Sequence, residues 1–245
     1  MFENSGDIAL LFWRTLLALP QTWRQRQKVM DQFFEIGNAS LLMVCVLTFF
    51  IGGVIALNFG PVLVEHGMAS AVGGVVGLAI AKELAPVMMA ILIAGRIGSA
   101  MAAEIGSMRV YQEIDALRTM NINPIHYLVL PRVLAIAFAL PMLVTFSVLV
   151  GWFGGAVVAN YNHLMDIPFR VFFADLKDIV KLQDVVNGVF KSFCFAVIIG
   201  VVSCHQGLTT IGGPRGIGRS VTKAVVNSIV LIVIFDYILT RILLN

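Results

Sequence analysis

Charged residues are scarce in this chain, and their scarcity decides its class. Only 13% of the 245 residues are Asp, Glu, Lys or Arg, whereas 59% are hydrophobic and the mean hydropathy is +0.91. A soluble domain carries roughly a quarter charged residues. The composition therefore excludes a soluble globular protein. It predicts an all-α integral membrane protein whose solvent is the bilayer.

Sequence signals for catalysis and for metal binding are also lacking. The three cysteines, Cys45, Cys194 and Cys204, are scattered through apolar runs, which provides neither a disulfide framework nor metal-ligand spacing. The four histidines lie far apart in the sequence, and no nucleophile or paired-carboxylate motif occurs. We therefore expect no catalytic residue, no metal and no cofactor bound by this chain, and no nucleic-acid partner.

Long runs without charge predict about five membrane-spanning helices. The clearest run lies between Glu35 and Glu65, and about 20 apolar residues suffice to cross the hydrocarbon. Four further apolar runs cover 67–103, 133–165, 192–214 and 224–244. The run at 67–103 is longer than one crossing needs, so it is either one long tilted helix or a partly re-entrant segment.

Lysine and arginine counts predict the orientation in the membrane. With the N-terminus inside, the inner segments hold ten such residues: Arg14, Arg24, Arg26, Lys28, Arg109, Arg118, Arg132, Arg215, Arg219 and Lys223. The outer segments hold four, Arg170, Lys177, Lys181 and Arg241, and Lys191 lies at a boundary. This excess favours a cytoplasmic N-terminus and a C-terminus on the outer side.

The runs and their flanks divide the chain into eight parts of a single domain. We expect interfacial helices at 1–37, the first two spans at 38–101, a cytoplasmic segment at 102–124, a third span at 133–160, an outer segment at 161–187, a fourth span at 188–205, a cytoplasmic loop at 206–224 and a fifth span at 225–244.

Two short segments are amphipathic rather than long enough to span. Near the N-terminus, apolar residues recur at helical spacing ahead of the basic stretch QTWRQRQK: Ile8, Leu11, Phe12, Leu16, Leu19 and Trp23. Such a segment suits the cytoplasmic membrane interface. In the outer segment, Pro168 precedes a second stripe, Phe169, Phe172, Phe173, Leu176 and Val180. This stripe predicts a helix on the outer surface, or one that docks a partner.

A third short segment, EIGSMRVYQEIDAL at 104–117, places several charges directly after a long apolar run. Val110, Ile114 and Leu117 are spaced to share one helix face. The segment is too short and too charged to span. Its composition and spacing leave two interpretations open: a connector resting on the membrane, or a helix docked in a groove of a cytosolic partner.

Five charged residues lie within the apolar runs, Lys82, Glu83, Arg96, Asp236 and Arg241, and each at bilayer depth costs at least about a few kcal/mol without a partner or water. Lys82 and Glu83 are adjacent, and two interpretations remain open for them: an ion pair or snorkelling at a helix end, or a hydrated cavity that holds a lipid headgroup. For Arg96 and Asp236 we expect a structural ion pair between spans. The GxxxG spacing of Gly151 and Gly155 indicates helix packing.

Two long stretches resemble one protein family. KELAPVMMAILIAGRIGSAMAAEIGSMRVYQEIDAL, residues 82–117, closely resembles the signature of the MlaE/YrbE family, the permease subunits of ABC transporters associated with MCE proteins. GGPRGIGRSVTKAVVNSIVLIVIFDYILT, residues 212–240, resembles the second signature of the same family. The resemblance covers nearly the whole chain and its five-span layout. One departure is visible, because the family often has Thr-Glu-Gln where this chain has Tyr111-Gln112-Glu113.

The resemblance implies a function and a set of partners. This chain would be the membrane subunit of a transporter in the bacterial inner membrane, not an enzyme, and would contribute to outer-membrane lipid homeostasis. Two copies would form a cavity, worked by two copies of a cytosolic ATPase that uses ATP and Mg²⁺. A periplasmic MCE protein would exchange phospholipid with it.

The resemblance also implies roles for particular residues. Residues 104–120 would be the coupling helix that sits in a cleft of the ATPase. Its polar contacts would come from Glu104, Arg109, Glu113, Asp115 and Arg118, and its apolar anchors would be Val110, Ile114 and Leu117. Lys82 and Glu83 would lie beside the lipid cavity, whose acyl-chain wall would include Ile55, Leu63 and Leu84.

The residues alone leave three other functions open. An ion-coupled secondary transporter of an amphiphilic substrate could use Lys82, Glu83 and Asp236, but it predicts an internal repeat that the sequence does not display. An intramembrane lipid-modifying enzyme predicts a cluster of catalytic groups, which is not found. A passive membrane scaffold predicts no bound lipid in a purified sample.

Overall fold

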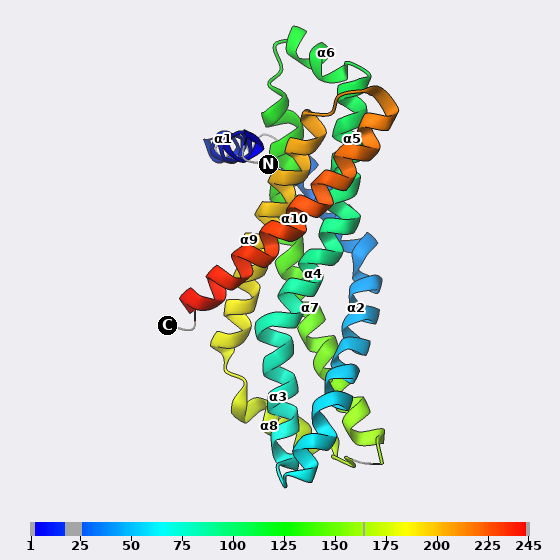
Figure 1. Ribbon diagram of the computed structural model, residues 1–245, viewed down its shortest axis with the longest axis vertical. Helices are drawn as coiled ribbons and strands as arrows, with labels where there is room; N and C mark the ends of the chain where they lie inside the picture. Colours follow the sequence, from blue (N-terminus) through cyan, green and yellow to red (C-terminus); the bar gives the residue numbers. More distant parts are fainter. Residues whose placement is uncertain (1–2, 18–25, 164, 244–245) are drawn as a thin grey trace. The chain divides into compact units, whose positions relative to one another are not determined.

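The computed structural model describes residues 3–17, 26–163 and 165–243, and all regular structure among them is helical. Five helical runs are long and apolar enough to cross a membrane: α2 (Arg26–Glu65), the run Ala69–Val110, the run Ile125–Tyr161, α9 (Leu182–Leu208) and α10 (Gly213–Leu243). Three shorter helices accompany them: α1 (Glu3–Leu17), α6 (Glu113–Thr119) and α8 (Phe169–Ile179) (Figure 1). The predicted all-α membrane fold is confirmed.

The second run is one unbroken succession of helical turns. It consists of η2 (Ala69–Ala71), α3 (Val72–Ala79), η3 (Ile80–Leu84), α4 (Ala85–Ile93), η4 (Ala94–Gly98) and α5 (Ser99–Val110). The third run likewise begins with η5 (Ile125–Val129) and continues as α7 (Leu130–Tyr161). η3, η4 and η5 are π-helical turns, which widen a helix locally and are frequent at functional sites. The long helix, not the re-entrant segment, is therefore observed at 67–103.

The described residues group into two compact units. The first takes the described residues of Met1–Asn38, Ala90–Leu140 and Phe193–Asn245, and the second takes those of Ala39–Met89 and Pro141–Ser192. Four helices, α2, α4, α7 and α9, contribute residues to both units.

In the second unit, α8 packs along α3. Phe172 and Leu176 of α8 are buried, and Leu176 lies over Gly77 of α3. The backbone N–H of Gly74 donates a 2.6 Å hydrogen bond to Asp175. The predicted amphipathic helix is thus present, but Phe172 and Leu176 of its apolar stripe pack inside the chain. Pro168 is the cap before the first turn rather than the first helical residue.

Also in the second unit, α2 and α7 approach each other at small residues. A Cβ added to Gly52 would collide with the carbonyl of Gly151, and one added to Gly154 would collide with the carbonyl of Phe49. The small-residue signal at Gly151 therefore marks close packing of these two helices, as in other membrane bundles. Gly155 faces Val76 of α3 instead.

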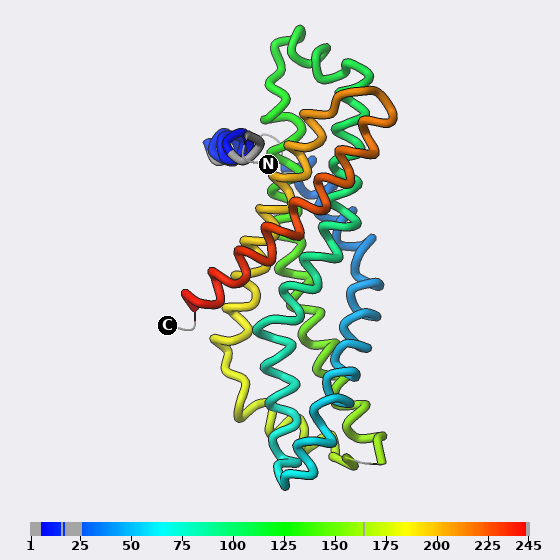
Figure 2. Tube along the Cα trace, viewed as in Figure 1, coloured from blue at the N-terminus to red at the C-terminus, as the bar shows by residue number. Residues whose placement is uncertain are grey.

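In the first unit, α10 lies beside α5, as the chain trace shows (Figure 2). The predicted cytoplasmic loop at 206–224 is wrong, because α9 continues to Leu208 and α10 begins at Gly213. Pro214 follows directly, and proline is well suited to the first turn of a helix, where its missing N–H would be unsatisfied in any case. The fifth span is correspondingly longer than the predicted 225–244.

The N-terminal helix α1 also belongs to the first unit and divides its apolar residues between two faces. Of the predicted stripe, Leu11 is buried in a core cluster that also contains Val129 and Cys204, and Ile8 packs against this cluster, whereas Phe12 is exposed. The predicted apolar stripe therefore packs largely inside the chain, and Leu10, Trp13 and Leu17, which lie outside the stripe, are exposed. Leu19, Trp23 and residues 21–25 of QTWRQRQK lie outside the described residues, as does the side chain of Leu16.

Candidate functional site

Four charged residues meet in the second unit, where η3 faces the first turns of α9. The ammonium of Lys191 lies 2.8 and 2.9 Å from the two carboxylate oxygens of Glu83. The ammonium of Lys82 lies 3.0 Å from Asp184. Two lysines and two acids make the cluster neutral. Asp184 and Lys191 were not among the predicted site residues, although their spacing of seven puts both on one face of a helix.

The backbone around Pro86 explains why Lys191 is held there. In an α-helix the carbonyl of Lys82 would accept a hydrogen bond from the N–H of residue 86, but proline has no N–H. The Lys191 ammonium donates to that carbonyl instead, at 3.3 Å. α9 can come this close because residue 188 is glycine: an added Cβ would collide with the carbonyl of Ala81 and lie 3.2 Å from Pro86.

Burial differs sharply within this cluster. The Lys191 side chain is 4% exposed, whereas those of Glu83 and Lys82 are 42% and 37% exposed. A buried ammonium in a membrane helix needs an acid and further hydrogen bonds, and here it has both. The ion-pair interpretation of Lys82 and Glu83 therefore describes their contacts in this chain. Their exposed parts leave a charged surface that a ligand can reach.

The three apolar residues expected beside Lys82 and Glu83 differ in exposure. Ile55 is 7% exposed and belongs to the interior of the second unit, so its prediction as part of an acyl-chain wall is wrong: a buried side chain offers almost no surface to a lipid. Leu63 and Leu84 are half-buried and remain predicted wall residues.

Arg96 and Asp236 lie on elements of the first unit that pack together. Arg96 belongs to the π turn η4, which contacts α10, the helix that carries Asp236. Both side chains take part in interactions. The ion pair between them stays a prediction.

The charged segment at 104–120 is two helices rather than one. α5 ends at Val110, and α6 begins at Glu113. Between them Gln112 has a φ of 62°, the left-handed conformation that a residue with a Cβ adopts at a cost. Because of this break, the helical spacing of Val110, Ile114 and Leu117 does not continue across the segment. The break coincides with Tyr111-Gln112-Glu113, where the sequence departs from the family pattern.

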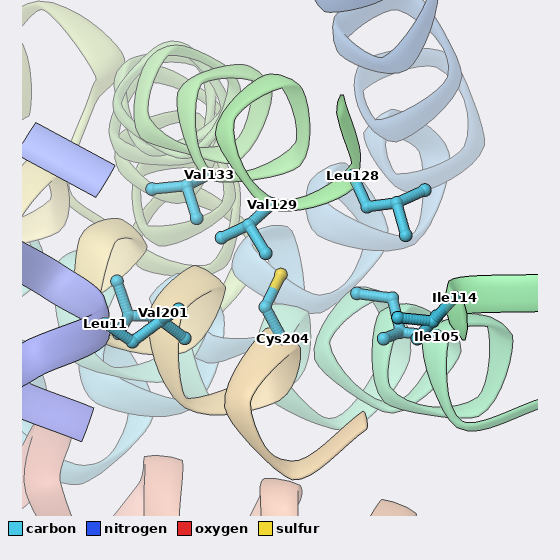
Figure 3. Close-up of a cluster of buried hydrophobic side chains, with 8 residues drawn as sticks. All are labelled: Leu11, Ile105, Ile114, Leu128, Val129, Val133, Val201 and Cys204. Carbon is cyan, nitrogen blue, oxygen red and sulfur yellow. The ribbon is translucent and has the colours of Figure 1, made fainter. Parts of the chain in front are cut away.

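Ile114 is corrected from partner contact to core residue. It is fully buried and lies in a cluster with Ile105, Leu128 and Cys204, which Figure 3 shows from within the first unit. Leu117 packs against the same cluster. Ile114 therefore cannot serve as a freely presented anchor for a partner, whereas Leu117 is half-buried and remains a predicted anchor. Tyr111 and Met120, which were not predicted, are instead 69% and 62% exposed.

The charges of this segment largely pair with one another. Asp115 is 2.8 Å from Arg109 and 3.4 Å from Arg118, and Glu104 is 3.0 Å from Arg132. Glu113 forms no ion pair with any described residue and is exposed. The internal pairs brace the turn between α5 and α6, since Arg109 and Asp115 come from its two sides.

Comparison with known proteins identifies the family of this chain. The family model for the permease MlaE matches residues 29–242. The chain belongs to the MlaE permease family. A probable ABC transporter permease protein of Synechocystis is 39% identical over 239 residues, which covers 98% of this chain and 90% of that protein. A probable ABC transporter permease protein of Rickettsia typhi is 37% identical over 245 residues, covering 98% and 92%.

A plant protein shares part of the same sequence. The chloroplastic protein trigalactosyldiacylglycerol 1 of Arabidopsis thaliana is 38% identical over 142 residues, which covers 56% of this chain and 38% of that protein. Together with the MlaE match, these relatives identify a multi-pass membrane permease subunit of the ABC transporter class rather than an enzyme. Within the described ranges, no group of three His, Cys, Asp or Glu side chains could hold a metal ion.

The backbone role assigned to Lys191 predicts an interaction between positions 191 and 86. Lys191→Met should leave the Lys82 carbonyl without a donor, at a cost of about 1–3 kcal/mol. The further substitution Pro86→Ala supplies a backbone N–H that can donate to the Lys82 carbonyl, and it should recover most of the stability lost there. Pro86→Ala should therefore stabilise the Lys191→Met chain more than it stabilises the unmodified chain. Thermal unfolding of the purified chain in detergent measures the difference.

Pro61→Ala is the matched control, because Pro61 also lies inside a membrane helix, α2, whereas the carbonyl to which Lys191 donates belongs to η3. It should change both backgrounds equally. If Pro86→Ala also changes both backgrounds equally, Lys191 does not act through the Lys82 carbonyl.

Proposed function

We propose that this chain is the membrane permease subunit of an ABC transporter that moves phospholipid between the bacterial inner membrane and a periplasmic MCE-domain protein. Two copies form the transport cavity, and two copies of a cytosolic ATPase drive them. The N-terminus lies in the cytoplasm and the C-terminus in the periplasm. The chain itself binds no cofactor, because ATP and Mg²⁺ are used by the ATPase. Its transport contributes to lipid homeostasis of the outer membrane.

The observation that carries the proposal is the MlaE match over residues 29–242, with permease relatives that cover nearly the whole chain. A lipid substrate is supported by the shared segment of the Arabidopsis protein, whose name is that of a diacylglycerol lipid. The excess of lysine and arginine in the segments assigned to the cytoplasm supports the orientation.

The surface around the α5–α6 turn is the proposed contact with the ATPase. Tyr111 and Met120 supply exposed apolar area, and Glu113 supplies a charge without a partner among the described residues. Large aromatic side chains that become buried commonly dominate an interface, whereas exposed ion pairs contribute little. Tyr111 and Met120 are therefore assigned as apolar anchors beside the half-buried Leu117, and the buried Ile114 is not one of them. Arg109, Asp115 and Arg118 hold the turn in shape.

The buried cluster around Ile114 is the proposed route by which motion leaves the ATPase. Ile114 of α6 shares this cluster with Val129 of η5, Val133 of α7 and Val201 of α9. Protein interiors are close-packed, so a displacement of α6 cannot be absorbed locally. It must move the adjoining ends of α7 and α9. The same helix α9 carries Asp184 and Lys191 at its other end.

The ionic cluster of Lys82, Glu83, Asp184 and Lys191 is the proposed headgroup contact. A phosphate competes with Asp184 for the half-exposed Lys82, and a headgroup amine can approach the exposed part of Glu83. Movement of α9 relative to η3 alters both pairs at once. The binding site would thus change its affinity when the ATPase closes on ATP.

A second copy is proposed to cover α10. Only 11% of the most apolar 18-residue stretch of α10 is buried inside the chain, against 39–56% of the corresponding stretch in each of the other four spans. Its exposed apolar residues include Val226, Val230, Val233 and Ile238. Either lipid or another protein helix satisfies such a surface in a membrane. The family resemblance favours a second copy of this chain.

Replacing Tyr111 and Met120 by Asp should release the ATPase while leaving the chain folded, because both side chains are exposed here and buried only in the proposed interface. We expect at least about a 30-fold loss of affinity, the equivalent of about 2 kcal/mol. Co-purification from native membranes, with binding measured on the purified partners, is the test. Tyr161→Asp is the control, since Tyr161 is 76% exposed on the segment assigned to the outer side.

If the ATPase still binds the Tyr111→Asp, Met120→Asp variant, this surface is not the contact with the ATPase. Ile114→Asp would not be a fair test of docking, because it places a charge in the core of the first unit and would unfold it.

Replacing Lys82 by Gln should reduce capture of a photoreactive phospholipid at η3 by about three- to tenfold. The expected loss is that of one charge-assisted contact to phosphate. Lys82 is the better position for this test than Glu83, because loss of Glu83 would also leave the buried Lys191 without its acid. Lys177→Gln on α8 is the control for loss of an exposed lysine. Equal capture by Lys82→Gln and the unmodified chain would exclude Lys82 from the lipid contact.

A further inference from the structure

An open cavity of about 250 Å³ with charged lining residues lies in the first unit beside the start of α2. Lys28, Asp31 and Gln32 line it from α2, and Tyr127, Pro131 and Arg132 line it from η5 and α7. We propose that this cavity binds the headgroup of a zwitterionic phospholipid, one that carries a phosphodiester and an ammonium group. The orientation proposed above decides from which side of the membrane the lipid enters. The chemistry of the cavity does not depend on that orientation.

Lys28 supplies the cation with unused donors. Its ammonium lies 3.3 Å from the ring centroid of Tyr127, a cation–π contact that fixes the charge over the ring. The aromatic ring is not a conventional hydrogen-bond acceptor, so this contact does not use up the three N–H donors of the ammonium. No described residue accepts a hydrogen bond from Lys28, so its donors remain available to a phosphate oxygen.

Arg132 lines the same cavity and brings a second positive charge to it. One terminal nitrogen donates to the carbonyl of Leu128 at 3.3 Å, and the other donates to Glu104 at 3.0 Å. These two contacts hold the guanidinium in place, and the side chain remains 14% exposed. Its charge therefore attracts a phosphate that enters the cavity.

The charge balance of the cavity favours a zwitterion over a free anion. Lys28 and Arg132 are opposed by Asp31, which lines the cavity and forms no ion pair with any described residue, and by Glu104, which pairs with Arg132. A dianionic free phosphate would meet little net positive charge there. A phosphodiester beside an ammonium instead matches the cation at Lys28 and the carboxylate at Asp31.

Size and position point to a lipid rather than to a soluble zwitterion. Cavities that enclose a whole drug-sized ligand measure about 300–1,000 Å³, so this smaller one suits a headgroup whose chains remain outside. Asp31 lies five residues before Ile36, where the uncharged stretch of α2 begins. Five residues span about 7.5 Å along a helix, which is about the thickness of one headgroup layer. Asp31 is therefore at the depth of the headgroups.

Photocrosslinking of the full chain, reconstituted without any ATPase, tests this inference. The vesicles contain phosphatidylglycerol and a small fraction of phosphatidylethanolamine with a photoreactive group near its glycerol. Crosslinks are mapped by mass spectrometry to peptides that cover 26–35 and 125–132. Lys28→Gln and Asp31→Asn should each reduce capture there by about three- to tenfold. Arg26→Gln is the matched control, because Arg26 is exposed on the same helix and does not line the cavity.

Capture that falls in both cavity variants, persists in Arg26→Gln and resists millimolar inorganic phosphate supports the inference. Capture unchanged in Lys28→Gln and Asp31→Asn overturns it. Capture abolished by inorganic phosphate overturns the lipid assignment and makes the cavity a site for free phosphate. Crosslinks at the peptide that contains Lys82 and Glu83 report separately on the proposed transport site, so the two proposals can fail independently.

Discussion

A membrane offers a buried ammonium no water, so Lys191 depends entirely on the groups that surround it. It has the carboxylate of Glu83 and the carbonyl of Lys82, to which residue 86 cannot donate because it is proline. The same contacts join α9 to the π turn η3 and hold Glu83 beside Lys82. Gly188 is required for this approach because a Cβ at that position would collide with the carbonyl of Ala81. The geometry of the proposed lipid contact therefore follows from satisfying one buried charge.

The first unit applies a different constraint to the proposed coupling. There the interaction is apolar: Ile114 ties the short helix α6 to a core that also contains residues of α1, α7 and α9. A short helix held by its buried Ile114, next to a turn that exposes Tyr111, is suited to pass on displacement. The left-handed turn at Gln112 and the Arg109–Asp115 pair set the angle between α5 and α6.

The sequence predicts the spans well and the direction of their side chains poorly. Runs with little or no charge locate all five spans, because a charge without a partner in hydrocarbon is costly and such residues are therefore rare there. In lipid, however, both the packed and the exposed faces of a helix are apolar, so periodicity does not separate them. For that reason the sequence does not reveal that Ile55, which the family resemblance placed beside a lipid, is buried.

Breaks in the helical pattern account for the other differences. The face shared by Val110 and Ile114 assumed one helix, whereas Gln112 adopts a left-handed conformation that spacing does not reveal. Asp184 and Lys191 were missed because their partners lie about a hundred residues away in the sequence. Pro86 was a usable signal: a proline inside a membrane helix frees a carbonyl, and a buried lysine is one of the few side chains able to donate to it.

Exchange of the two charges between Lys191 and Glu83 tests the central claim most directly. Lys191→Glu alone should bring two acids together and Glu83→Lys alone should bring two lysines together, so each should lower the yield of folded chain and its thermal stability. The double variant restores an opposite pair and should recover a substantial part of both, as its measured unfolding temperature would show. A double variant no more stable than the worse single variant would contradict the account.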